Sequence, residues 1–300
     1  MTLLSRRRFL AISAASAACP AVAAPAPTAR WHGSALGASA TMQLAGLTDA
    51  QAHPIFAAVE AEVTRLENIF SLYRPDSQLS RLNRDGQLSN PAPELLSLFS
   101  LCSALHENSD GVFDPTIQPL WVALANNASA ADIASAKATI GWHNVTVESD
   151  AVRLPYPGQS ALTLNGIAQG AITDRIAALL RSKGLRNVLV DMGEIAALGY
   201  RNDGQPWQVG LAGPERTVKK RIALSDRAVA TSDSSSLMLT GVHGHILSPT
   251  GQMPNHQVLS VSAKTAALAD GLSTALCALS DRQIANALQR FPDARLEMKI

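Results

Sequence analysis

The hydrophobic periodicity of this chain changes near Val145, and that change constrains the fold more than any other feature of the sequence. Before Val145, apolar residues recur at the three- and four-residue spacing of amphipathic helices. After it, short runs of β-branched and apolar residues are separated by Gly, Asn, Asp and Pro, which is typical of strands joined by turns. The sequence therefore predicts an α+β fold in which a mostly helical N-terminal part packs with a strand-rich C-terminal half.

The N-terminal part is expected to begin with one strand, Leu36–Leu44, after a Pro/Ala linker. The next segment, Leu47–Ile69, has helical periodicity, and Pro54 is expected to interrupt it because proline lacks the N–H donor and clashes with the preceding turn. A polar loop, Ser71–Ser77, follows. Further helices are expected at Glu94–His106, Leu120–Leu124 and Ala131–Ala138.

The C-terminal half is expected to combine short strands with two longer helices and a short terminal one. The expected strands are Ala161–Leu164, Asn187–Val190, Trp207–Leu211, Ala228–Thr231, His245–Leu247 and Val258–Ser262. The expected helices are Ile167–Ser182, Lys264–Ala278 and Ile284–Leu288.

Residues 1–24 have the pattern of a twin-arginine export signal. Ser5–Leu10 contains the paired arginines followed by Phe-Leu, and Ala11–Ala18 is a weakly apolar, small-residue segment that ends near Ala21–Ala23. We therefore expect export in the folded state and a periplasmic location. The alternatives are an ordinary basic leader and a lipid-attachment site at Cys19. The apolar run Phe9–Ala18 is about half of the roughly 20 residues that span a bilayer, so no transmembrane segment is expected.

The charge balance and the cysteines narrow the class of protein further. Residues 1–24 hold three arginines and no acidic residue, so their removal leaves 22 of 25 Lys and Arg against 24 Asp and Glu, a formal charge of −2. This balance argues against nucleic acid as a partner. Cys102 and Cys277 both lie in apolar helical patterns, and we expect two buried free thiols.

An acidic and a hydroxyl side chain share one face of an expected helix. Asp270 and Thr274 are four residues apart, and their oxygen atoms are ligands of the kind that Mg²⁺ takes. A solvated helix face is the simpler interpretation of such a pair. However, the surrounding helix is largely apolar, and an aspartate in a mostly buried helix needs a partner.

The segment Asn165–Gly170 leads from an apolar run through an Asn-Gly turn into a helix, with Asp174 one turn further on. Glycines and the exposed N–H groups of a helix N-terminus favour a phosphate at such a place. A tight turn into the helix, with no ligand, is the alternative interpretation.

Two loops combine an aromatic side chain with hydrogen-bonding groups, a mixture that suits a flat heterocycle. In Phe70–Ser77 the relevant residues are Tyr73 and Ser71, and in Asp110–Thr116 they are Phe113 and Asp114. The alternative is purely structural, with Asp76-Ser77 capping a short helix and Asp114-Pro115 starting a turn.

Two histidines, His243 and His245, flank Gly244. No third histidine or cysteine lies at ligand spacing, which argues against zinc. A general-base role for His245 is chemically reasonable because the ordinary pKa of histidine lies near neutral pH.

Eight segments, taken in order, carry a resemblance to a known family. They are Phe70–Asn83, Gly111–Thr116 with Pro119-Leu120, Asn165–Gly170 with Asp174, Val190–Gly193, Trp207–Gly210, Ala228–Ser232, His245–Pro249 and Ala269–Ala275. From about Leu36 to Leu279 the chain resembles the ApbE family of FAD:protein FMN transferases. The specific part of this resemblance is the order of the motifs.

The resemblance implies a T-fold-like architecture for residues 25–300 and a site that uses Mg²⁺ and FAD. Magnesium would be held by Asp270, Thr274 and the backbone of Ala168, with the FAD diphosphate bridging it. A threonine hydroxyl of a partner protein would attack the phosphorus next to FMN and release AMP, with His245 and Asp270 as the catalytic residues. The resemblance implies FAD contacts for Leu36, Ser71, Leu72, Tyr73, Asp114, Gln169, Thr231, Ser232 and His245.

Together with the export signal, the resemblance implies an acceptor flavoprotein of a membrane respiratory system. By analogy, the chain is similar to the NosX-like accessory factors of nitrous oxide respiration, with a NosR-like acceptor. A non-catalytic FAD carrier and an FAD pyrophosphatase that yields FMN and AMP are the alternative functions.

The chain also departs from the family pattern at several positions. Leu36-Gly37-Ala38 replaces a Met-Gly-Thr, Gln169 replaces a common lysine, Asp233 replaces a glycine, and the motif after His245 is shortened to Ser248–Gly251. The loss of a lysine at Gln169 removes one positive charge near the expected diphosphate, which is expected to affect nucleotide binding.

Overall fold

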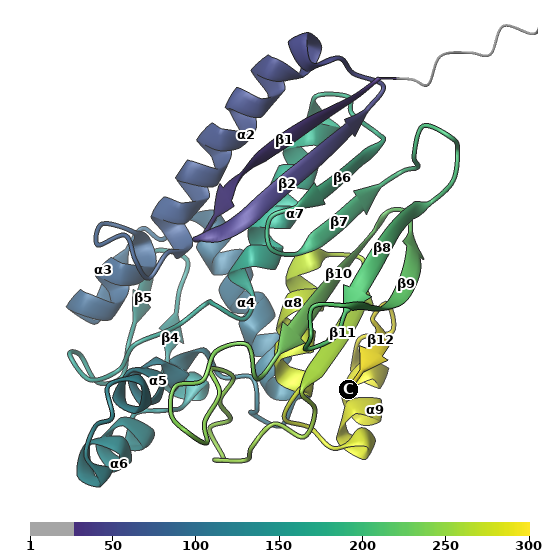
Figure 1. The fold of residues 1–300 in the computed structure, drawn as a ribbon. Helices are drawn as coiled ribbons and strands as arrows, with labels where there is room; N and C mark the ends of the chain where they lie inside the picture. Colours follow the sequence, from purple (N-terminus) through teal and green to yellow (C-terminus); the bar gives the residue numbers. More distant parts are fainter. Residues whose placement is uncertain (1–26) are drawn as a thin grey trace, which may run out of the picture.

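The computed structural model describes residues 27–300; the expected export signal and Cys19 lie outside the described residues. Seven strands form one antiparallel sheet in the order β1-β2-β6-β7-β10-β11-β12 (Figure 1). These strands are β1 (Thr28–Ala35), β2 (Ala38–Ala45), β6 (Val188–Asp191), β7 (Ile195–Leu198), β10 (Arg227–Asp233), β11 (Val258–Ala263) and β12 (Arg295–Lys299).

The N-terminal hairpin belongs to the same sheet as the C-terminal strands. Ala35 pairs with Ala38 across a two-residue turn in which Leu36 and Gly37 both have positive φ, at 48° and 81°. Two positive φ values are typical of a tight hairpin turn that matches the twist of its strands. Strand β2 then pairs with β6, with Met42 opposite Val190. The two halves of the chain are therefore joined through one sheet.

Helices cover one face of the sheet and form the main core with it (Figure 1). Helix α2 (Asp49–Phe70) packs on β1, α7 (Ala168–Ser182) on β6 and β7, and α8 (Ala266–Leu276) on β10 and β11. Helix α4 (Pro93–Asn108) packs in turn against α2 and α8. This helical layer positions α7 and α8 side by side, and both contribute to the site described below.

A second hairpin, β8 (Trp207–Ala212) and β9 (Val218–Leu224), covers the other face of the sheet. Its inward residues, among them Trp207 and Leu224, form a smaller core with Ala197 and Val229 of the large sheet. Burying apolar side chains on both faces explains why the inner strands carry almost continuous apolar runs.

The remaining elements surround the lower end of the sheet in Figure 1. They are α3 (Gln78–Asp85), β3 (Gln87–Ser89), a 3-10 turn η1 (Pro115–Ile117), α5 (Gln118–Ala125), α6 (Ala130–Ala138), a 3-10 turn η2 (Trp142–Asn144), β4 (Thr146–Val147), β5 (Ala151–Arg153) and α9 (Asp281–Arg290).

The predicted α+β class is confirmed. Cys102 and Cys277 are buried free cysteines, as expected. Within residues 27–300, the helices are too short or too polar to cross a bilayer.

Three predictions about single elements were wrong. Helix α2 runs through Pro54 without interruption. Pro54 lies in the second turn, and the start of the helix is fixed by a capping box between Thr48 and Gln51. The loss of one N–H donor so close to a well-capped end is tolerated.

Ala161–Leu164 is not a strand, although Leu162 and Leu164 are buried. Its backbone groups are satisfied elsewhere: the Asn83 side-chain amide donates to the Leu162 carbonyl at 2.8 Å and accepts from the Leu162 N–H at 2.7 Å. His245–Leu247 is not a strand either. Only an isolated bridge between Met238 and Gly244 forms there.

Candidate functional site

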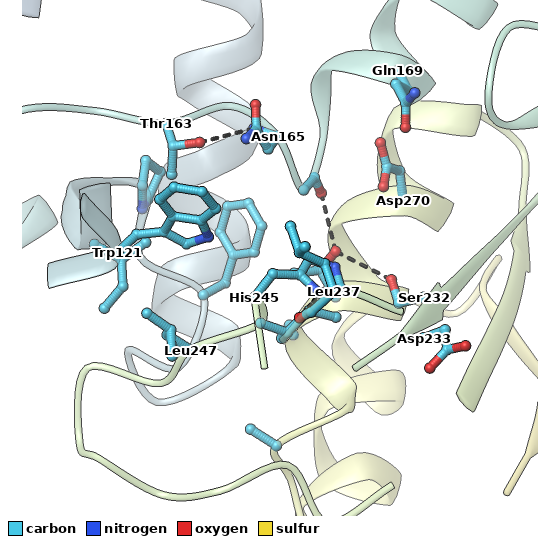
Figure 2. Close-up of a pocket in the computed structure, with 18 of the residues that line it drawn as sticks. Trp121, Thr163, Asn165, Gln169, Ser232, Asp233, Leu237, His245, Leu247 and Asp270 are labelled. Atoms are coloured by element: carbon cyan, nitrogen blue, oxygen red, sulfur yellow. Dashed lines mark hydrogen bonds between the residues drawn. The ribbon is translucent and has the colours of Figure 1, made fainter. Parts of the chain in front are cut away.

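A pocket of about 470 Å³ lies where α7, α8 and β10 meet the loops that follow α4 and β10 (Figure 2). It brings together eight residues that the sequence nominated from separate parts of the chain. They are Tyr73, Asp114, Gln169, Thr231, Ser232, His245, Asp270 and Thr274. Phe113, Asn165 and Gly166 also line it.

Four nominated residues do not line this pocket. The Leu36 N–H in the β1–β2 turn donates to the Glu67 carboxylate at 2.9 Å. The Ser71 hydroxyl accepts from the N–H groups of Tyr73 and Arg74, so it holds its loop together. Leu72 lies in a neighbouring surface hollow, and Ala168 is buried at the start of α7.

Asp270 is the buried carboxylate of the pocket. It lies on α8, is 4 % exposed, and accepts a hydrogen bond from the Gly170 N–H of α7 at 3.0 Å. Burial raises the pKa of Asp270 to about 7, because the charged form loses its hydration. A cation beside it would restore the charged form.

The Asn165–Gly170 segment positions α7 against α8. A Cβ atom on Gly170 would lie 2.4 Å from the Ala266 carbonyl oxygen, so only glycine allows this helix contact. Asp174, one turn further on, accepts from the N–H groups of Ala266 and Ala267 at 2.7 and 2.9 Å. Asp174 therefore caps the N-terminus of α8. Of the two glycines, Gly166 lines the pocket and Gly170 does not.

Thr274 lies one helical turn after Asp270 and reaches the turn before α7. Its hydroxyl donates to the Gly166 carbonyl at 3.4 Å and lies 3.3 Å from the Ser232 hydroxyl. A Cβ on Gly166 would come within 3.0 Å of the Thr274 hydroxyl oxygen. The absence of a side chain at Gly166 therefore keeps a carboxylate, a hydroxyl and a backbone carbonyl close together.

The oxygen atoms of the Asp270 carboxylate, the Thr274 hydroxyl and the Gly166 carbonyl are ligands that suit a hard cation. In the described part of the chain, no three His, Cys, Asp or Glu side chains cluster as a metal site. Asp114, Glu194, Asp233 and Asp270 contribute acidic groups to the pocket, and the described residues that line it include no Lys or Arg. Burial, together with the neighbouring Asp270, raises the pKa of Glu194 well above its ordinary value. A divalent cation with oxygen ligands fits this surplus of carboxylates.

Both carboxylate oxygens of Asp114 accept hydrogen bonds from other residues of the protein. One of its oxygens accepts from the N–H and hydroxyl of Thr116, and the other accepts from the Trp142 N–H at 3.1 Å. It also caps the 3-10 turn η1. The structural interpretation of the Asp114-Pro115 pair therefore holds, as it does for Ser77, which caps α3.

Gln169 lies beneath the turn between β6 and β7. A Cβ on Gly193, whose φ is 105°, would lie 2.6 Å from the Gln169 side-chain nitrogen. The missing side chain at Gly193 thus makes room for the amide that stands where the family pattern has a lysine. Glu194, next in the chain, accepts from the Thr231 N–H at 3.3 Å.

The opposite end of the pocket is apolar and aromatic. Figure 2 shows Trp121 on the far side of His245 from Asp270 and Gln169. Phe113, Ile117 and Leu247 line the same end. Sequence reasoning missed Trp121 and Glu194. Each stands next to a recognised motif, Pro119-Leu120 and Val190–Gly193 respectively, and this adjacency was the available signal.

His245 lies between the two ends. Its Nδ1 is 3.3 Å from the Leu237 carbonyl oxygen, which can only accept, so Nδ1 carries the proton and Nε2 is the free base of the neutral ring. Burial lowers the pKa of His245 below its ordinary value. His243 is instead paired with the Thr240 hydroxyl at 3.1 Å and does not line the pocket.

The structure has close neighbours among solved proteins. It superposes on the apo crystal structure of Pseudomonas stutzeri flavinyl transferase ApbE with a TM-score of 0.75 and 27% sequence identity, over 88% of this chain and 89% of that one. The flavin transferase ApbE of Vibrio cholerae has the same fold, with a TM-score of 0.75 at 24% identity over 87% of this chain and 91% of that one. The fold is thus that of flavin transferases.

The sequence comparisons agree with this class. The ApbE family profile matches residues 36–297. The FAD:protein FMN transferase of Vibrio cholerae is 29% identical over 249 residues, which are 75% of this chain and 74% of that protein. That of Klebsiella pneumoniae is 27% identical over 282 residues, which are 86% and 80% of the two chains. The chain belongs to the ApbE family.

Proposed function

We propose that this protein is a magnesium-dependent FAD:protein FMN transferase that attaches FMN to a threonine of a partner protein. The observation that carries the proposal is the polarity of the pocket. The buried carboxylates of Asp270 and Glu194, with no lysine or arginine in the described lining, lie at one end, aromatic and apolar side chains lie at the other, and His245 lies between them. FAD has the matching parts, with an anionic diphosphate between flat heterocycles. Relatives with the name FAD:protein FMN transferase support the assignment.

A magnesium ion would allow an anionic diphosphate to bind in an acidic pocket, because its positive charge offsets the repulsion between them. Asp270 and Thr274 would hold it with a backbone carbonyl at the start of α7, where the family pattern uses Ala168. When bound, the ion neutralises charge on the diphosphate and stabilises charge that develops during its cleavage.

Other residues of the pocket have the remaining roles in the proposed reaction. His245 Nε2 accepts the proton of the acceptor threonine as its oxygen attacks the FMN phosphorus. A new phosphoester bond forms, the phosphoanhydride bond to AMP breaks, and AMP carries away that bond's electron pair. Gln169 and Ser232 are the neutral polar groups that orient the diphosphate, and the aromatic end around Trp121 excludes water.

We further propose that the reaction serves an extracytoplasmic respiratory flavoprotein. The twin-arginine pattern of residues 5–10 supports export, and the periplasmic location follows from it. A NosX-like role with a NosR-like acceptor rests on analogy with the same pattern.

The test is to incubate the mature chain with FAD, MgCl₂ and an acceptor domain, and to look for fluorescent, covalently labelled acceptor together with AMP. Label on threonine that disappears with EDTA is the expected result. FAD recovered intact in all reactions would contradict transfer and identify a carrier. AMP and free FMN in equal amounts, with no labelled acceptor, would identify a pyrophosphatase.

A further inference from the structure

A second, smaller hollow of about 150 Å³ lies next to the pocket, between helices α5 and α6 and the loop 243–254. We call it the side groove. Its wall is largely apolar and consists of Leu120, Leu124, Ile133, Ile246, Leu247 and Met253, with Lys137 and His243 among its polar members.

The side groove and the pocket share one wall. Ile246 and Leu247 line both, and α5 contributes Trp121 to the pocket and Leu120 to the groove. The two shared residues face different surroundings: Ile246 packs against the main core, and Leu247 packs against the cluster around Leu120. The shared wall therefore begins at the residue that directly follows the candidate base, His245.

The backbone of the shared wall is unpaired. Within residues 27–300, the N–H and carbonyl groups of Ile246 and Leu247 make no hydrogen bond, whereas the His245 N–H donates to the Leu237 carbonyl at 2.9 Å. Backbone N–H and carbonyl groups without a partner are available for hydrogen bonds to a bound segment.

Exposed apolar side chains gather on the same loops. Leu237, Met238, Val242 and Met253 are between 49% and 65% exposed, and all lie in the segment after β10 that carries His245. Apolar side chains that stay in water around a cleft are typical of a surface that a partner covers.

We infer that the side groove is the docking site of the acceptor polypeptide. The acceptor binds as an extended segment along Ile246 and Leu247, inserts one large aliphatic side chain into the groove, and thereby presents its threonine to His245. The size of the groove supports a single side chain, because an apolar cavity of about 150 Å³ accommodates a benzene-sized group. This inference rests on the proposed transfer reaction.

The test uses end-blocked nonapeptides of Ala and Ser that contain one threonine and one leucine, with the leucine one, two or three residues from the threonine. A matched peptide has alanine in place of leucine. With FAD and MgCl₂, at least one leucine peptide should accept FMN with a kcat/KM about tenfold above its alanine counterpart, and the difference should lie in KM.

Two variants separate the groove from the chemistry. Ile133→Trp fills the groove from α6 and should remove the leucine preference, so that both peptides react at the rate of the alanine peptide. Ala134→Trp adds the same side chain at the next, exposed position, outside the groove, and should keep the preference. Flavin fluorescence should report the same FAD affinity for both variants and the parent.

Three results would overturn the inference. The first is equal reactivity of the leucine and alanine peptides, and the second is no labelling of any peptide. In both cases the proposed transfer reaction is judged separately, by labelling of a whole acceptor domain. The third is a dimer of the parent that Ile133→Trp converts into a monomer, which would assign the groove to a second copy of the chain.

Discussion

Asp270 on α8 and Gly170 on α7 are joined by a hydrogen bond of 3.0 Å from the Gly170 N–H to the carboxylate. The connection is reciprocal, because Asp174 on α7 accepts from the first N–H groups of α8. The candidate cation ligand is therefore fixed in place by the contact between two helices, and each of its supports can be tested separately.

Replacing Asp270 by asparagine keeps the shape and the bond from Gly170 but removes the charge. We expect Asp270→Asn to reduce FMN transfer by a factor of about 100 or more, consistent with the loss of an electrostatic contribution of about 3 kcal/mol. MgCl₂ should raise the melting temperature of the parent protein and not that of the variant. An equal rise in both would contradict Asp270 as a ligand.

The same substitution should change the pH dependence of stability. The pKa of Asp270 is 3.8 in the unfolded chain and about 7 in the folded protein, so the folded protein binds this proton more tightly. The stability that results is complete below about pH 4 and is lost as the pH rises to 7. The asparagine side chain of the variant does not ionise. In EDTA, the variant's unfolding free energy should therefore exceed the parent's increasingly between pH 4 and 7, by on the order of 4 kcal/mol at the upper end. Urea titrations at pH 4, 5.5 and 7 measure this difference.

The helix contact at Gly170 should not tolerate a methyl group. Gly170→Ala places a Cβ against the Ala266 carbonyl and separates α7 from α8, at an expected cost of about 1–3 kcal/mol in unfolding free energy. Gly241→Ala is the control, since nothing lies within 4 Å of its added Cβ and its φ is not positive. Chemical denaturation of both variants gives the comparison. Equal stability would contradict the close approach of the two helices.

His245 should control the acid side of the pH profile. Because burial lowers its pKa, we expect kcat/KM for transfer to rise with pH and to reach half its maximum below pH 6.5. His245→Gln should lower kcat by about 10²–10⁴ and leave FAD affinity nearly unchanged. A profile measured from pH 4.5 to 8 with a midpoint above 6.5 would exclude this assignment.

The sequence predicted the long helices well and the site in part. Asp270 and Thr274 were predictable as a pair because helical spacing alone places them on one face. The role of Asp174 was not, because its partners, Ala266 and Ala267, are 92 and 93 residues away in sequence. Likewise, the polar Asn83 takes the backbone bonds of Leu162 that a strand partner was expected to take.

The sequence analysis also missed strands β7 and β9, and both edge strands of the large sheet. Thr28–Ala35 buries only Ala29, Trp31 and Ala35, and its composition resembles a linker. Strand β12, at the opposite edge, carries charged residues at 295, 297 and 299. Charges on edge strands oppose unwanted pairing, and they also weaken the apolar pattern from which strands are predicted.

The reciprocal contact between α7 and α8 also orders the events of biosynthesis. Gly170 and Asp270 are a hundred residues apart, so a ribosome has nearly finished the chain before the two helices can meet. A product interrupted before residue 266 contains the aromatic end of the pocket but neither Asp270 nor Thr274. Such a fragment also lacks Ala266 and Ala267, so Asp174 has no N–H groups to accept from, and the contact that holds α7 against α8 cannot form.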